Sequence, residues 1–368
     1  MTDPVELTRQ LIRLDTADGH EAAAAAMLVP ILSACGMHVE CDDLAPGRSN
    51  LIARCGSNTA LSLTLSGHLD TVPLGTAEWA AAPRGGEIVA GRVLGRGASD
   101  MKAGVAALVV ALERHRARCA SCGSILLLLT AGEESGCWGA RRLIEMRELP
   151  QGGPLLVAEP TANRPAPGHK GALWLEITAR GRAAHGSRPD LGENAITALA
   201  RLALRLEDEG HPGVHPVMGP VTVNVGTFAG GAQVNLVPDR AVMAVDIRLV
   251  PSTTPAQMTA FVRSLAGPGV SVEPVLEMPA VYTAPDRGFP RLVAEAVRDV
   301  TGDAACAPPA TYFTDASVLS EALGGAEVVI LGPGDVEVAH AVDESCAVDR
   351  IHEAVDIYER ILDRWCAH

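Results

Sequence analysis

Short apolar runs that each end near a histidine or an acidic residue constrain the fold of this chain most. Such runs lie at 61–65, 125–129, 155–158 and 328–331. The metal-binding residue types that follow them are His68, Asp70, Glu133, Glu134, Glu159 and His340. In an open α/β sheet the functional site lies beyond the carboxyl ends of the strands. We therefore expect segments far apart in the sequence to deliver these side chains to one place.

Two imidazoles and several carboxylates form a donor set that suits a pair of divalent metal ions, zinc above all. Two metals a few ångströms apart need a bridging ligand, and a carboxylate serves this purpose. Asp100 is the best candidate, because it ends the glycine-rich segment 95–99 and precedes an expected helix at 101–115. The alternative for Asp100 is an ordinary helix N-cap.

The neighbours of these candidates indicate supporting roles. In the segment His68-Leu69-Asp70, the histidine binds metal through one ring nitrogen and Asp70 accepts a hydrogen bond from the other. In the pair Glu133-Glu134, one carboxylate ligates while the other acts as general base and acid. Taken singly, each motif has an ordinary explanation, such as a turn aspartate or an acidic pair at a helix start. It is much less expected that the ordinary explanation holds for all of the motifs at once.

Bulk properties exclude some classes of function. The chain has 368 residues, which favours about two domains, and 48% of them are hydrophobic. A formal net charge of −14 argues against nucleic acid or an anionic membrane as a partner. The N-terminus lacks the pattern of a secretory signal, and the apolar runs are too short to span a bilayer. We expect a cytoplasmic protein.

Cysteine usage agrees with a reducing compartment. Nine scattered cysteines do not form a disulfide framework. Cys119 and Cys122 make a single C-x-x-C pair, which is weak evidence for a metal or redox site. The simpler expectation is a loop that carries two free thiols.

The order of elements predicts an α/β protein with an insertion. Helices are expected at 4–14, 20–36, 101–115, 193–208, 254–265, 292–300 and 349–365. Strands are expected at 50–55, 61–66, 87–94, 124–130, 155–158, 173–177, 221–225, 242–249, 270–275 and 327–331. The β-α-β-β-α-β order of the middle region is ferredoxin-like. We expect a three-layer α/β catalytic domain at 1–170 and 281–368, interrupted by an α+β domain at 171–280.

Several longer motifs match those of a known family. They are Gly67–Pro73, Gly95–Lys102, Gly132–Gly136, Glu159–Thr161, Gly181–Ser187, Gly192–Ile196, Gly230–Pro238, Asp246–Arg248, Thr314–Ala316 and Gly332–Gly334. With these motifs the chain resembles the M20 family of zinc peptidases and deacylases over nearly its whole length. That group holds acetylornithine deacetylase, succinyl-diaminopimelate desuccinylase, aminoacylase and carboxypeptidase G.

The resemblance implies a role for each candidate residue. His68, Asp100 and Glu159 would hold one Zn²⁺, and Asp100, Glu134 and His340 the other, with Co²⁺ or Mn²⁺ as substitutes. Glu133 would be the general base, supported by Asp70. The inserted domain would be a lid and a homodimer interface, from which His185 reaches the neighbouring subunit's site and stabilises the oxyanion. Substrate-binding residues would be Asn235, Arg248, Gly332 and Gly334, where the guanidinium of Arg248 suits a carboxylate.

The resemblance further implies hydrolysis of an amide bond. The segments around Trp174 and His185 favour removal of an acyl group, most simply acetyl, from an N-acyl amino acid such as N-acetylornithine or N-acetyllysine. Alternatives are a dipeptidase or carboxypeptidase, an N-succinyl-diaminopimelate desuccinylase, and a non-enzymatic binding protein of the same fold. Tyr312 and Phe313 stand where many relatives have glycines, so the pocket can differ from theirs.

Overall fold

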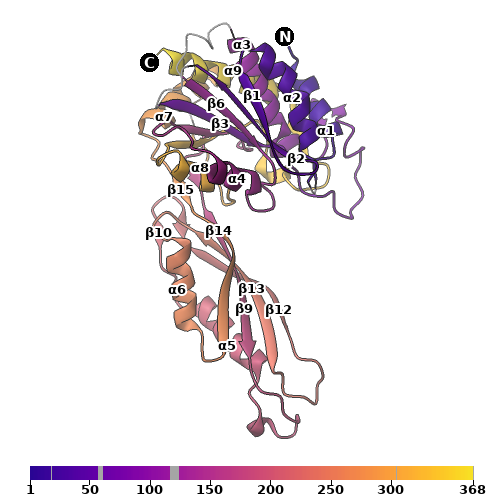
Figure 1. Ribbon diagram of the computed structural model, residues 1–368, viewed down its shortest axis with the longest axis vertical. Helices are drawn as coiled ribbons and strands as arrows, with labels where there is room; N and C mark the ends of the chain where they lie inside the picture. Colours follow the sequence, from indigo (N-terminus) through magenta and orange to yellow (C-terminus); the bar gives the residue numbers. More distant parts are fainter. Residues whose placement is uncertain (18, 57–60, 117–123, 304, 368) are drawn as a thin grey trace. The chain divides into compact units, whose positions relative to one another are not determined.

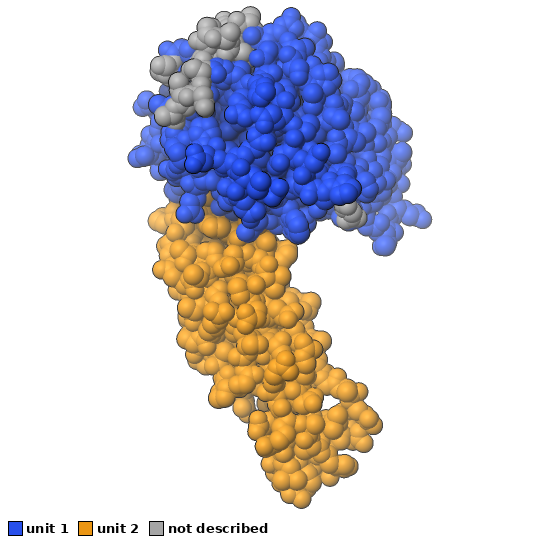
Figure 2. All heavy atoms as spheres, viewed as in Figure 1, with its two compact units in different colours: residues 1–168, 282–308, 314–368 blue, residues 169–281, 309–313 orange. Residues whose placement is uncertain are grey.

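The chain divides into two compact units, drawn in blue and orange in Figure 2. A computed structural model describes residues 1–17, 19–56, 61–116, 124–303 and 305–367. Unit 1 comprises Met1–Gly168, Tyr282–Pro308 and Thr314–His368, and unit 2 comprises His169–Val281 and Pro309–Phe313. The short segment Pro309–Phe313, which belongs to unit 2, is not part of the inserted range that the sequence predicts.

Unit 1 is built on a six-stranded mixed sheet (Figure 1). The strands, in their order across the sheet, are β1 (His38–Ala45), β2 (Arg48–Cys55), β6 (Ser124–Thr130), β3 (Ser62–His68), β7 (Leu155–Val157) and β16 (Val328–Ile330). The last four run parallel, whereas β1 and β2 form an antiparallel hairpin that pairs with β6. Parallel strands bring their carboxyl ends to one edge of the sheet, as the sequence predicts.

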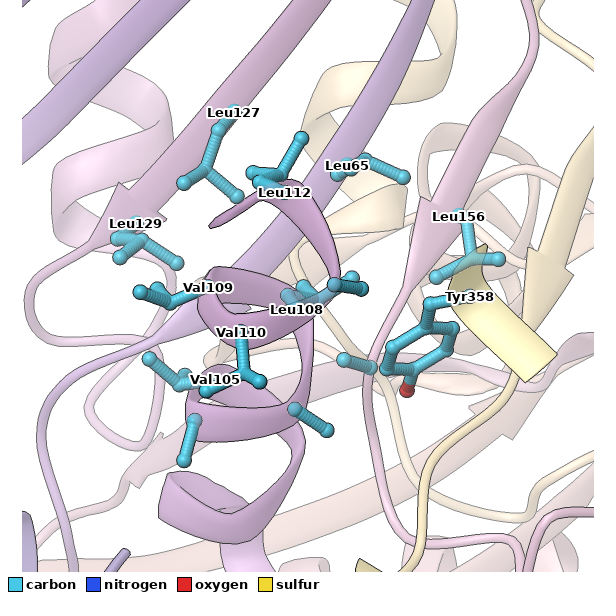
Figure 3. Close-up of a cluster of buried hydrophobic side chains, with 14 of the residues drawn as sticks. Leu65, Val105, Leu108, Val109, Val110, Leu112, Leu127, Leu129, Leu156 and Tyr358 are labelled. Atoms are coloured by element: carbon cyan, nitrogen blue, oxygen red, sulfur yellow. The ribbon is translucent and has the colours of Figure 1, made fainter. Parts of the chain in front are cut away.

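One face of this sheet carries the main hydrophobic core, to which α1 (Pro4–Arg13), α2 (Ala22–Ala34), α3 (Ala103–His115), α7 (Gly288–Thr301) and α9 (Val348–Cys366) all contribute. Residues from Ala103 to Leu112 of α3 are all buried. Figure 3 shows side chains of α3 beside those of the strands, among them Leu108 and Leu127. The shorter helices α4 (Trp138–Met146) and α8 (Ala316–Ala322) lie on the other side of the sheet (Figure 1). The three-layer α/β class is confirmed.

Unit 2 is a four-stranded antiparallel sheet with two helices. Its elements are β9 (Gly171–Arg180), α5 (Ala195–Asp208), β12 (Thr222–Gly230), β13 (Arg240–Leu249), α6 (Pro255–Leu265) and β14 (Val270–Met278). The strand order β12-β13-β9-β14 with this connectivity is the ferredoxin-like arrangement. A small hairpin of β10 (Val214–His215) and β11 (Gly219–Pro220) is added between α5 and β12.

The sequence missed or simplified several elements of unit 1. The single strand expected at 87–94 is a hairpin of β4 (Ile88–Val89) and β5 (Arg92–Leu94), because Ala90 and Gly91 turn the chain at φ of 49° and 75°. Strand β1 was not predicted, since its acidic residues at an exposed sheet edge hide the apolar alternation. Neither α4 nor α8 was predicted.

The remaining elements are short. They are a π-helical turn (Ala98–Lys102), 3₁₀ turns at Pro189–Leu191 and Val336–Val338, β8 (Gly168–His169), β15 (Val281–Tyr282) and β17 (Ser345–Ala347), which pairs with β5. Among the described residues, no helix combines the length and apolarity needed to cross a bilayer.

Candidate active site

The carboxyl ends of the parallel strands in unit 1 place the predicted residues next to one another. His68 is the last residue of β3, Glu133 and Glu134 follow β6, and Glu159 follows β7. His340 comes after β16 and the Gly332–Gly334 turn. The topology therefore explains why residues distant in sequence meet at this edge.

Asp100 lies between the two histidines. Its Oδ1 is 3.1 Å from Nε2 of His68, and its Oδ2 is 3.2 Å from Nε2 of His340. On the first side, Glu159 Oε1 is 3.7 Å from the same His68 nitrogen. On the second, Glu134 Oε1 is 3.0 Å from Nε2 of His340. The Asp100 carboxylate thus faces a histidine and a glutamate on each side, as a bridging ligand would.

Asp100 does not cap a helix. It sits inside the turn Ala98–Lys102, ahead of α3, and its own backbone is extended with φ −124° and ψ 97°. The N-cap alternative for Asp100 is therefore wrong. The turn aims its side chain at both imidazoles.

The potential donor atoms form two overlapping groups. His68, Asp100 and Glu134 offer atoms within 4.8 Å of one another, and so do His68, Glu133 and Glu159. Glu133 therefore lies as close to the cluster as a ligand would. Its side chain is enclosed, with only 5% of the residue exposed. Geometry alone leaves Glu133 free to act as base or ligand.

The electrostatics of the cluster show a shortage of positive charge. Burial, reinforced by neighbouring carboxylates, raises the pKa of Glu133 and Glu159 well above the usual range. Burial also favours a higher pKa at Asp100, but hydrogen bonds with His340 and His68 outweigh it and lower the pKa. Hydrogen bonds to Asp100 and Glu134 raise the pKa of His340 to about 10. The charged forms of these carboxylates therefore need positive charge beside them.

This donor set fits divalent metal ions. Buried charges in proteins are paired or coordinate metals. Within the part of the chain that the structure describes, the ion pairs of Asp100, Glu134 and Glu159 involve only His68 and His340. Imidazole nitrogen together with carboxylate oxygen is the donor chemistry of catalytic zinc and related ions.

Asp70 contacts His68, as the sequence predicts, and has a second task besides. The ring Nδ1 of His68 is 3.0 Å from the backbone carbonyl of Asp70 and 3.5 Å from its carboxylate. The carboxylate also accepts the backbone N–H groups of Glu133 and Glu134, each at 3.1 Å. Asp70 therefore fixes the His68 ring through its main chain and the glutamate pair through its side chain.

Two further anchors hold the Glu133–Glu134 turn, and the sequence did not single out either of them for this role. Asn50 of β2 accepts the N–H of Ala131 at 3.0 Å and donates to the carbonyl of Gly139 at 3.1 Å. On the other side, the Thr130 hydroxyl donates to the buried carboxylate of Asp315. The sequence indicated Asp315 only as part of the Thr314–Ala316 motif.

The two glycines assigned to substrate binding also allow close backbone approach. A Cβ on Gly332 would lie 2.3 Å from the carbonyl oxygen of Ala158, next to Glu159. A Cβ on Gly334 would lie 2.2 Å from the carbonyl oxygen of Ser99, next to Asp100. Glycine at these positions lets the turn pack against two segments that carry candidate ligands.

The other predicted site residues, His185, Asn235 and Arg248, belong to unit 2. Ser187 N–H donates to Nδ1 of His185 at 3.1 Å, so the proton of a neutral ring is on Nε2. The carbonyl of Asn235 accepts the N–H of Gly186 at 2.7 Å. Arg248 donates from Nε and Nη2 to Asp246 at 3.2 and 3.1 Å, so its charge is already paired.

Two sequence features remain. Tyr312 and Phe313 are half-buried in unit 2 and directly precede the buried Thr314 of unit 1. Cys119 and Cys122 lie outside the described residues.

Comparison with known proteins identifies the family. A model of Peptidase family M20/M25/M40 matches residues 64–364. The chain belongs to this family. The resemblance drawn from the motifs is confirmed, and the chain is a metal-dependent hydrolase of amide bonds.

Curated relatives in this family carry different substrate names. An acetylornithine deacetylase from Myxococcus xanthus is 32% identical over 338 residues, which cover 88% of this chain and 86% of that protein. A succinyl-diaminopimelate desuccinylase from Rhodospirillum centenum is 32% identical over 391 residues, which cover 99% of this chain and 98% of that protein.

Solved structures show the same fold at lower identity. An M20 family metallo-carboxypeptidase from Sulfolobus solfataricus superposes with a TM-score of 0.81 at 18% identity, covering 100% of both chains. Aminopeptidase PepT from Bacillus cereus has a TM-score of 0.79 at 21% identity, covering 98% of both chains.

Proposed function

We propose that this M20 hydrolase removes the acetyl group from an N-acetylated amino acid such as N-acetylornithine or N-acetyllysine, using two Zn²⁺ ions. The observation that carries the proposal is Asp100, whose two oxygens face His68 and His340 at 3.1 and 3.2 Å. His68, Asp100 and Glu159 would hold one ion, and Asp100, Glu134 and His340 the other. Bound there, the ions would supply Lewis-acid polarisation of the amide carbonyl and a more acidic water.

The chain's own residues then handle the proton. Glu133 would be the general base, the role that the family motif gives it, and its carboxylate lies within the donor cluster on a backbone held by Asp70 at 3.1 Å. It takes a proton from the attacking water and delivers it to the leaving amine. Nε2–H of His185 would donate to the oxyanion in the neighbouring subunit's site, because Nδ1 already accepts from Ser187.

Support for an acetyl substrate comes from the Myxococcus xanthus acetylornithine deacetylase, at 32% identity. The desuccinylase from Rhodospirillum centenum has the same 32% identity over more of the chain, so removal of a succinyl group is an equal second candidate. A substrate carboxylate would be bound by Arg248 together with Asn235, Gly332 and Gly334. This requires the substrate to compete with Asp246 for the guanidinium.

The experiment is a turnover panel with protein loaded with Zn²⁺, and with Co²⁺ or Mn²⁺ in parallel. Amine release is measured from N-acetylornithine, N-acetyllysine, N-succinyl-diaminopimelate, other N-acyl amino acids and free dipeptides. Glu133→Gln should abolish turnover while both ions remain bound, whereas Glu145→Gln on the exposed face of α4 should not change it. Turnover confined to succinyl substrates or to free dipeptides would overturn the acetyl assignment.

We also propose a cytoplasmic homodimer formed through unit 2. Strand β12 is an edge of the unit 2 sheet, and residues Thr227–Gly230 along it are exposed. An open edge can pair with the same edge of a second copy. Light scattering should give twice the chain's mass of 38.2 kDa, and a monomer at micromolar concentration would contradict the proposal.

A further inference from the structure

A buried ion pair lies behind the donor cluster, and its two residues come from the two segments that carry Asp100 and His340. Arg96 Nη1 donates to Oε2 of Glu344 at 2.7 Å. Glu344 is fully buried and Arg96 is 5% exposed. Arg96 precedes Asp100 by four residues, and Glu344 follows His340 by four.

Glu344 fixes the backbone at Asp100. Its Oε1 accepts the N–H of Ser99 at 2.8 Å and the N–H of Asp100 at 3.0 Å. Two amides that converge on one carboxylate oxygen set the orientation of the peptide plane ahead of the Asp100 side chain. Glu344 therefore acts on Asp100 from the His340 segment.

Arg96 fixes the backbone at His340 in the same way. Its Nη2 donates to the carbonyl of His340 at 3.2 Å, and its Nη1 donates to the carbonyl of Ala341, also at 3.2 Å. The guanidinium lies over the ring of Trp79, 5.1 Å from its centre, which keeps it in place. His340 has a left-handed backbone with φ 61°, a conformation that an L side chain rarely holds without support.

From this reciprocal arrangement we infer that Arg96 and Glu344 are positioning residues that hold Asp100 and His340 at the spacing of a metal site. The inference rests on the metal centre of the proposed function. Each segment supplies the residue that orders the other segment's ligand, so neither ligand is placed by its own segment alone.

Simple docking of the two segments does not require this pair. The Ser99 hydroxyl and the backbone of Asp335 already exchange two hydrogen bonds, at 2.8 and 2.7 Å. A buried ion pair is also weak as a source of stability, because desolvation offsets its attraction. Burial of Arg96 carries a further cost in folding free energy, since its Nε has no acceptor within the described part of the chain. Positioning of ligands accounts for a pair that stability alone does not favour.

The test measures the two metal dissociation constants by competition with a chelator, with metal content determined by mass spectrometry. Arg96→Met should raise the dissociation constant of one ion by about 10- to 100-fold, the range for residues that orient metal ligands. That ion should be the one lost in His340→Ala. Glu344→Gln should weaken the binding of both ions, because Asp100 faces both histidines. Arg96→Lys, which keeps the charge and part of the hydrogen bonding, should give an intermediate affinity.

A destabilised control separates positioning from folding. Leu32→Ala removes a fully buried side chain of α2 in the core and should lower thermal stability without changing either metal affinity. If Arg96→Met and Arg96→Lys bind both ions like this control, the inference is wrong while the proposed function stands. If the unaltered protein binds fewer than two ions, both proposals fail together.

Discussion

Gly104 of α3 gives a sharp test of how the fold places Glu159. A Cβ at this position would lie 2.2 Å from the carbonyl oxygen of Ala158 and 3.1 Å from its Cβ. Gly104→Ala therefore forces the helix and the end of β7 apart, although in an exposed helix the same change would stabilise. The N–H of Ala158 donates to the carbonyl of Ser66 at 2.9 Å, and this bond would be strained.

Gly104→Ala has two opposing effects on the free energy of unfolding, a gain in helix propensity and a loss from overpacking, and they differ in size. Alanine gains at most about 1 kcal/mol over glycine in a helix. Overpacking a close-packed core costs about 1–3 kcal/mol, and the upper end applies because the obstructing atom is backbone. We expect a net loss of about 2 kcal/mol of unfolding free energy. Because Glu159 directly follows Ala158, weaker metal binding should accompany this loss.

Urea unfolding followed by circular dichroism measures the loss. Gly288→Ala is the matched control at the start of α7, where a Cβ would meet only Oε2 of Glu327 at 3.6 Å. That variant should match or slightly exceed the original stability, since it restricts the unfolded chain. A Gly104→Ala protein as stable as this control would refute the close approach of α3 to β7.

Two other predictions concern anchors and pH. Asn50→Ala leaves the buried N–H of Ala131 without its acceptor and removes one hydrogen bond to the carbonyl of Gly139, so it should cost about 2 kcal/mol in urea unfolding. Turnover should fall as well, because Ala131 and Gly139 flank the glutamates; unchanged turnover would contradict this role. Burial lowers the pKa of His169 to about 4, so below pH 6.5 the unfolded state takes up a proton that the native state refuses. Unfolding free energy should therefore fall by up to about 3 kcal/mol between pH 6.5 and 4, and His169→Asn should flatten that part of a urea titration.

The sequence predicted the parts of the site that follow from strand order. His68, Glu133, Glu134 and Glu159 each follow an apolar run, and parallel strands bring such positions to one edge. His340 was harder to place, since it lies ten residues beyond β16. Its motif, not its spacing, indicated its position.

What the sequence missed depends on contacts between loops. β1 was hidden because an exposed edge strand needs no apolar alternation, and its residues at 40, 42 and 43 are acidic. The sequence indicated the contact between Asp70 and His68, but the bonds from the N–H groups of Glu133 and Glu134 to the Asp70 carboxylate depend on two loops meeting. Asn50, by contrast, lies in none of the motifs that match the family.

The supporting residues of this site share one physical feature. Asp70, Asn50 and Glu344 each use a side-chain oxygen to accept a backbone N–H beside the candidate ligands. A carboxylate or amide oxygen that holds a main-chain N–H fixes the direction of the next side chain without adding a donor that competes for the metal. Such contacts require only that two loops meet, so any residue with a suitable oxygen can serve. Their positions therefore follow from tertiary structure, which explains why motif-based prediction finds the ligands before it finds what orients them.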